Sequence, residues 1–87
     1  MVPLLTTLGN VLYEQNKSSK ALRYLERAYR ISPRQTSGGL VTLGSIYYEK
    51  SKPNKARNIY KEYLRLFPRG KHVRDVRSML KSINLNR

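Results

Sequence analysis

Apolar residues recur at every third or fourth position along most of this chain, the spacing that places them on one face of an α-helix. Polar stretches interrupt this pattern and divide it into five segments. These segments predict five helices, whose apolar residues lie at Leu4–Leu12, Ala21–Ile31, Leu40–Tyr47, Ala56–Phe67 and Val73–Ile83. Pro53 is expected to open the fourth helix, because the fixed φ of proline suits a first helical turn.

Residues between the apolar segments predict where the helices begin and end. Pro33 and Pro68 are expected to end the second and fourth helices, because the residue before a proline avoids the α conformation. Ser18 or Ser19 is expected to cap the second helix by accepting a backbone N–H. Residues 35–39 are polar, include two glycines, and predict a turn before the third helix.

The chain contains the same unit twice. Four identical pairs recur at a separation of 35 residues: Leu8/Leu43, Gly9/Gly44, Ala21/Ala56 and Pro33/Pro68. A fixed period of this length is typical of a solenoid, in which stacked helical hairpins bury faces that one hairpin cannot bury alone. Such architectures usually bind other macromolecules.

The two units resemble the tetratricopeptide repeat, whose usual length is 34 residues. The matching positions are Leu5, Leu8, Gly9, Leu12, Ala21, Leu25, Ala28 and Pro33 in the first unit, and Leu40, Leu43, Gly44, Tyr47, Ala56, Tyr60, Tyr63 and Pro68 in the second. The resemblance implies an all-α fold, an α-solenoid wound as a right-handed superhelix. It also implies a single domain over residues 1–87, with repeats at 2–35 and 36–69 and a capping helix at 70–84.

Two details refine the resemblance. Tyr63 stands where the family usually has alanine, which predicts looser packing against the last helix. The closing segment, residues 67–83, is similar to that of bacterial envelope tetratricopeptide proteins. The chain is therefore expected to be part of a larger bacterial protein, located in the cytoplasm or, if it comes from an envelope protein, in the periplasm.

The resemblance implies a concave groove that holds a peptide or a helix of a partner protein. The first helix of each pair would line it, which gives the candidate groove residues Thr6, Asn10, Tyr13, Val41, Ser45, Tyr48, Arg74, Ser78 and Lys81. Tyrosines offer a large contact area, asparagine can bond a peptide backbone, and cations suit a carboxylate. The alternatives are that the tyrosines cover seams between helices and that the cations belong to a solvated face.

Charge adds a second hypothesis. The chain has 18 Lys and Arg against five acids, a formal charge of +13. Nine of the cations are expected on the convex side: Lys20, Arg23, Arg27, Arg30, Arg34, Lys55, Lys61, Arg65 and Arg69. They suggest an acidic protein segment or, as less favoured partners, nucleic acid or anionic lipid; alternatively they form a soluble outer face. Glu26 and Glu62 are expected to pair with Arg30 and Arg65.

A third hypothesis concerns the first helix, which no repeat precedes within this sequence. A homodimer is expected through its uncovered apolar residues, Val2, Leu4, Leu5 and Leu8. Catalysis is not expected, because His72 is the single histidine, the acids are scattered and Gly38-Gly39 is not followed by the Lys-Ser/Thr of a phosphate-binding loop. With no cysteine either, the sequence offers no metal site and implies no cofactor.

Overall fold

The computed structural model describes residues 1–85, and all of its regular structure is helical. The five α-helices are α1 (Val2–Glu14), α2 (Ser18–Ile31), α3 (Ser37–Glu49), α4 (Pro53–Leu66) and α5 (Val73–Leu85), with a short 3-10 helix, η1 (Pro33–Gln35), before α3. The prediction of an all-α solenoid with five helices is therefore confirmed.

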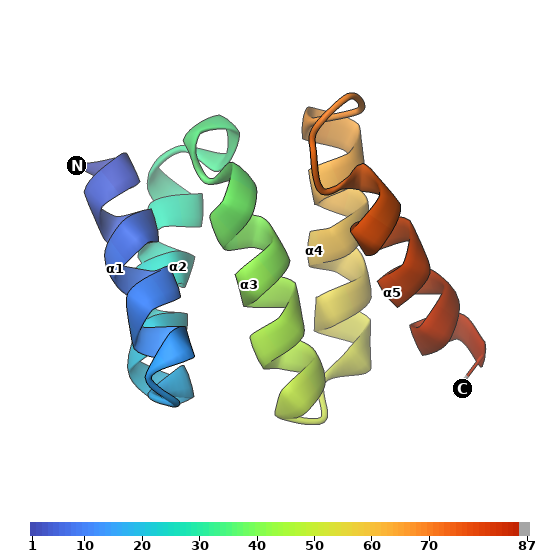
Figure 1. The fold of residues 1–87 in the computed structure, drawn as a ribbon, viewed down its shortest axis with the longest axis horizontal. Coiled ribbons are helices and arrows are strands. Elements are labelled where there is room, and N and C mark those ends of the chain that lie inside the picture. Colours follow the sequence, from blue (N-terminus) through green and yellow to red (C-terminus); the bar gives the residue numbers. More distant parts are fainter. Residues whose placement is uncertain (86–87) are drawn as a thin grey trace.

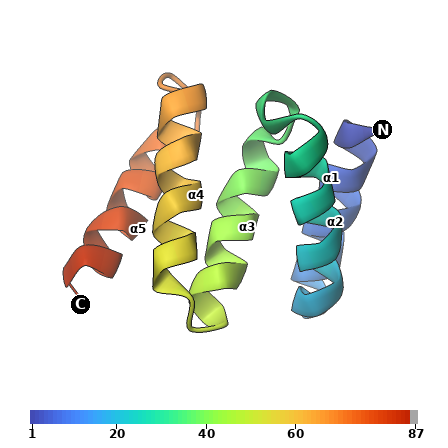
Figure 2. The same cartoon turned by 180° about the vertical axis from the view of Figure 1, so that it is seen from behind.

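The helices stand side by side and alternate in direction along the chain (Figure 1). In Figure 1, α1, α3 and α5 lie towards the viewer, and in the reverse view of Figure 2, α2 and α4 do. The molecule measures 35 × 27 × 19 Å, and its shortest dimension matches two helices, each about 10 Å across. The fold is therefore a two-layered slab with one face formed by α1, α3 and α5 and the other by α2 and α4.

The turns inside the two hairpins have the same geometry. Asn16 and Ser51, which are 35 residues apart, both adopt a left-handed backbone, with φ of 63° and 61°. In each turn the next N–H bonds back to the preceding helix, Lys17 to the Leu12 carbonyl at 2.8 Å and Lys52 to the Tyr47 carbonyl at 2.9 Å. The duplication in the sequence therefore extends to the backbone of the turns.

This turn explains why the expected serine cap is wrong. The left-handed residue leads the chain directly into α2, so Lys17 takes the N-cap position and makes no side-chain cap bond. Ser18 is already the first helical residue. A serine hydroxyl caps a helix only from the flanking, non-helical position.

The predicted turn at residues 35–39 is also wrong, because α3 already begins at Ser37 and includes both glycines. Thr36 precedes the helix, is fully buried, and donates its hydroxyl to the Ser32 carbonyl at 2.7 Å. A Cβ atom on Gly39 would lie 2.8 Å from Cγ2 of Thr6. The glycine is therefore required by the close contact between α1 and α3.

Each hairpin places a glycine of its first helix against a large residue of its second. A Cβ on Gly9 would lie 2.6 Å from the Leu25 side chain, and one on Gly44 would lie 2.5 Å from the Tyr60 ring. Leu25 and Tyr60 are themselves 35 residues apart. The alanines of the repeat, Ala21, Ala28 and Ala56, are fully buried, as the packing of two close helices requires.

Leu8 departs from its expected structural role. It is 39% exposed, whereas Leu43, its equivalent in the second repeat, is 1% exposed. The core that includes Leu43 also contains residues of α2, and no helix stands in the corresponding place beside α1. The position is buried only where another hairpin precedes it.

The expected loose packing around Tyr63 is wrong as well. Its side chain is fully buried, its ring centroid lies 5.3 Å from that of Phe67, and its hydroxyl accepts the His72 N–H at 3.0 Å. Gly70 leaves room for the same hydroxyl, because a Cβ there would overlap it. The larger side chain therefore fills the space between α4 and the segment that leads to α5.

Candidate protein-binding groove

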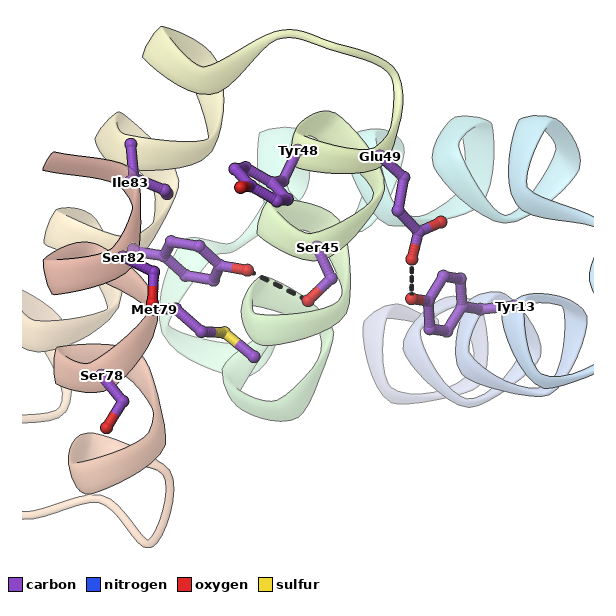
Figure 3. A pocket seen from close by; sticks show the side chains of 9 residues that line it. Tyr13, Ser45, Tyr48, Glu49, Ser78, Met79, Ser82 and Ile83 are labelled. Carbon is purple, nitrogen blue, oxygen red and sulfur yellow. Dashed lines mark hydrogen bonds between the residues drawn. The ribbon is translucent and has the colours of Figure 1, made fainter. Parts of the chain in front are cut away.

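A hollow of about 510 Å³ opens among α1, α3, α4 and α5 (Figure 3). It is bordered by aromatic, hydroxyl, thioether and aliphatic side chains and by one carboxylate: Tyr13, Ser45, Tyr48, Glu49, Tyr60, Ser78, Met79, Ser82 and Ile83. Pockets of this size and mixed lining suit a segment that buries apolar groups and is oriented by a few polar contacts.

A short chain of hydroxyl groups fixes the wall of the hollow beside α3. Oγ of Ser45, labelled in Figure 3, lies 3.0 Å from the Tyr60 hydroxyl. The same Oγ lies 3.0 Å from the carbonyl of Val41. Because Ser45 has one proton to donate to that carbonyl, Tyr60 donates to Ser45. Burial raises the pKa of Tyr60, because a phenolate would be poorly solvated there.

A second bond joins the two repeats across the hollow. The Tyr13 hydroxyl on α1 donates to the carboxylate of Glu49 at the end of α3 (Figure 3). This bond, together with partial burial, raises the pKa of Tyr13 from 10.0 to about 12, because a phenolate would face a carboxylate. Tyr13 therefore both lines the hollow and covers the seam between α1 and α3.

The Tyr13–Glu49 bond predicts a loss of stability at alkaline pH. The folded pKa of Tyr13 lies above the unfolded value, so its contribution is complete below pH 10 and is lost as the pH rises through about 12. Urea titrations between pH 9 and pH 12 should show a steeper decline for the natural chain than for Tyr13→Phe. Lysine titration is common to both proteins, so parallel curves would contradict the bond.

The structure separates the nine candidate groove residues. Tyr13, Ser45, Tyr48 and Ser78 border the hollow. A neighbouring hollow of about 710 Å³ shares Ser78 and is bordered along α5 and the preceding turn by Arg74 and Lys81, with Gly70, Lys71, Val73, Asp75 and Arg77. The remaining three, Thr6, Asn10 and Val41, border neither hollow.

These three residues lie where helices pack together. Thr6 meets Gly39 of α3, and Oγ1 of Thr6 and Oδ1 of Asn10 are buried without a hydrogen-bond partner. Val41 is half-buried against the core. The close approach of α1 to α3 at Gly38 and Gly39 partly buries Thr6 and Asn10. A prediction from the family's first helices alone does not include this contact.

Five lining residues were missed by the sequence interpretation: Glu49, Tyr60, Met79, Ser82 and Ile83. Glu14 and Glu49 recur at the repeat interval, which was a usable signal for Glu49. Met79 and Ser82 directly follow Ser78 and Lys81, which were predicted to line the groove. The predicted face of α5 is therefore shifted by about one residue from the observed one. Tyr60 gave no signal, because its position marks the hairpin core and only its hydroxyl end reaches the hollow.

The opposite face is formed by α2 and α4 (Figure 2), and both helices carry basic residues. All nine expected convex cations are exposed. Glu62 bonds to Arg65, which lowers the pKa of Glu62 and raises that of Arg65. Glu26 accepts the Tyr47 hydroxyl at 2.5 Å. No salt bridge to Arg30 occurs in residues 1–85, so the expected Glu26–Arg30 pair is wrong.

An apolar strip on α1 faces solvent. Leu4 is 70% exposed and Val11 is 42% exposed, and with Leu8 they follow helical spacing along one side of α1. Leu43 and Ile46, which correspond to Leu8 and Val11, are buried. Of the four residues expected to support a homodimer, Leu4 and Leu8 lie in this strip, Leu5 is half-buried and Val2 is buried. The homodimer stays a prediction.

Two further features bear on function. No helix within residues 1–85 is long and apolar enough to cross a lipid bilayer. In the same part of the chain, no three histidine, aspartate or glutamate side chains lie together as they would around a metal ion.

Comparison with known families agrees with the duplicated hairpin. Two family models, both described as tetratricopeptide repeat, match residues 2–35 and 38–69, which together make up most of the chain. A search of the curated proteins gave no match. Repeats of this family are non-catalytic and generally mediate contacts between proteins. The chain therefore belongs to the tetratricopeptide repeat family.

Proposed function

We propose that this protein is a non-catalytic interaction module that binds a segment of a partner protein in the hollow between α1, α3 and α5. The hollow of about 510 Å³ supports this proposal most directly. The helices α1, α3 and α5 supply Tyr13, Tyr48 and Met79 to the hollow, whereas α2 and α4 carry many exposed cations. Aromatic and methionine side chains are enriched at the centres of protein interfaces.

The two adjoining hollows suggest the chemistry of the partner segment. Apart from Glu49, the first hollow is lined by residues without charge. The second offers Lys71, Arg74, Arg77 and Lys81 against one acid, Asp75. A segment with an apolar or aromatic part followed by acidic residues would place each part against a matching surface. Such a segment, extended or helical, is the proposed ligand.

A peptide selection tests the proposal. Random 16-residue peptides displayed on phage would be selected on the natural chain, and the dissociation constants of the recovered peptides measured by fluorescence anisotropy. Tyr48→Ala should weaken binding about tenfold or more, because aromatic residues in such pockets often contribute above 1 kcal/mol. The recovered peptides should combine aromatic and acidic residues.

The matched control is Tyr24→Ala, since Tyr24 lies on α2, outside both hollows. It should leave peptide affinity unchanged. Circular dichroism should show equal helicity for both variants. Peptides whose affinity falls with Tyr24→Ala and survives Tyr48→Ala would contradict binding in the groove.

A further inference from the structure

The face formed by α2 and α4 carries many more basic than acidic side chains. The nine cations named for it are exposed, and its two acids are Glu26 and Glu62. Glu62 forms the one salt bridge within residues 1–85, with Arg65, while the Glu26 carboxylate is bonded by the Tyr47 hydroxyl. Lys55 lies 5.5 Å from the centre of the Tyr47 ring. The remaining cations of this face therefore have no ionic partner in the described chain.

This face is also poor in exposed apolar groups. The exposed large hydrophobic residues lie at the N-terminus and on α1, on α3, and at the ends of α2 and α5: Met1, Leu4, Leu8, Val11, Tyr48, Ile31 and Leu85. Protein interfaces depend on buried apolar and aromatic anchors, and membrane-surface helices insert such groups into lipid. Interfaces with nucleic acid are more polar and much more positively charged.

The spacing of the charges on α2 suits a row of phosphates. Lys20, Arg23, Arg27 and Arg30 follow one another at intervals of three or four residues and border a hollow of about 570 Å³. At a rise of about 1.5 Å per residue, they are about 5 Å apart along the helix and extend over about 15 Å. Three of the four are arginines, whose planar group can bond two phosphate oxygens.

We propose that the face formed by α2 and α4 binds the phosphate backbone of nucleic acid without reading its sequence. Arg23, Arg27 and Arg30 are the central contacts, and the cations of α4 extend the surface. Tyr24 is the one aromatic residue that borders the α2 hollow, so the surface lacks the series of stacking residues that single-strand binders use. This site lies on the face opposite the proposed peptide groove (Figures 1 and 2).

The test is fluorescence anisotropy of a labelled 20-base-pair duplex of arbitrary sequence, titrated with the full chain between 50 and 200 mM salt. If about six phosphates are contacted, affinity should fall about thousandfold over this range. The triple variant Arg23→Gln/Arg27→Gln/Arg30→Gln should bind more than tenfold more weakly at 50 mM salt. It should also reduce the slope of log affinity against log salt by about 2.7, since each contact contributes about 0.9.

The control is Arg74→Gln/Arg77→Gln/Lys81→Gln, which removes three exposed cations from α5 and so lowers the net charge equally. It should keep most of the affinity, and circular dichroism should show both variants to be folded. Equal losses in the two variants, or no binding by the natural chain at 50 mM salt, would overturn the proposal. Equal affinity for polyglutamate of the same charge would also overturn it, because an acidic protein would then be as good a ligand. Tyr48→Ala should bind the duplex with the affinity of the natural chain. Loss of peptide binding in the groove can therefore be distinguished from loss of duplex binding.

Discussion

Tyr63→Ala is expected to lower the free energy of unfolding by about 3–5 kcal/mol, the usual cost of removing a buried aromatic side chain. Tyr63 is fully buried between α4 and the segment leading to α5, and its ring lies beside the rings of Phe67 and His72. A domain of this length has a total stability of about 4–13 kcal/mol. Urea titration followed by circular dichroism should therefore show a large fall in the unfolding midpoint.

Tyr63→Phe separates packing from hydrogen bonding at the same position. It keeps the ring and removes only the hydroxyl that accepts the His72 N–H, so we expect a loss of about 1 kcal/mol. Equal losses for phenylalanine and alanine would show that the hydroxyl, and not the ring, holds α5 in place. A loss below 1 kcal/mol for alanine would mean that Tyr63 does not support the last helix.

Leu25→Ala is expected to cost about 3 kcal/mol, within the 2–5 kcal/mol typical of buried leucines. Leu25 is fully buried and lies against Gly9 of α1 and Gly39 of α3. Neither glycine has a side chain that could move into the vacated space, so most of the cavity should remain. Thermal and urea unfolding of the variant, compared with the natural chain, would measure the loss.

Leu4→Ala is the matched control, because it removes the same atoms from the same repeat at a site that is 70% exposed. Exposed substitutions of this kind usually change stability by less than about 0.5 kcal/mol. The contrast between the two leucines measures burial directly. Similar losses at both sites would indicate that the exposed strip on α1 is covered in solution, as the homodimer hypothesis requires.

The helices were predictable from the sequence because helical periodicity is a local property. The apolar spacing gave five helices of the correct type, and the 35-residue recurrence of Gly9, Ala21 and Pro33 indicated that they form two equivalent hairpins. The start of α4 was predictable as well, since Pro53 is its first residue. The start of α2 was less predictable, because the left-handed residue Asn16 sets the entry into this helix, and such a conformation has no strong signal in a residue that is not glycine.

The groove was only partly predictable, because its lining depends on side chains that lie far apart in the sequence. Tyr13 meets Glu49 across 36 positions, and Tyr60 reaches the hollow from a helix assigned to the core. Thr6 and Asn10 are half-buried because α1 and α3 approach closely at Gly39 and Gly38. In each case, the packing of whole helices determines which side chains come into contact.

By itself, the sequence determined the number of helices, their pairing into hairpins and the placement of small residues where helices cross, because these follow from spacing along one chain. Only the tertiary structure decided which polar groups face the hollow, that Glu26 bonds to Tyr47 and not to Arg30, and that Tyr63 fills the space before the last helix. Those outcomes depend on distances between separate helices, and hydrogen bonds and close packing respond to differences of about an ångström.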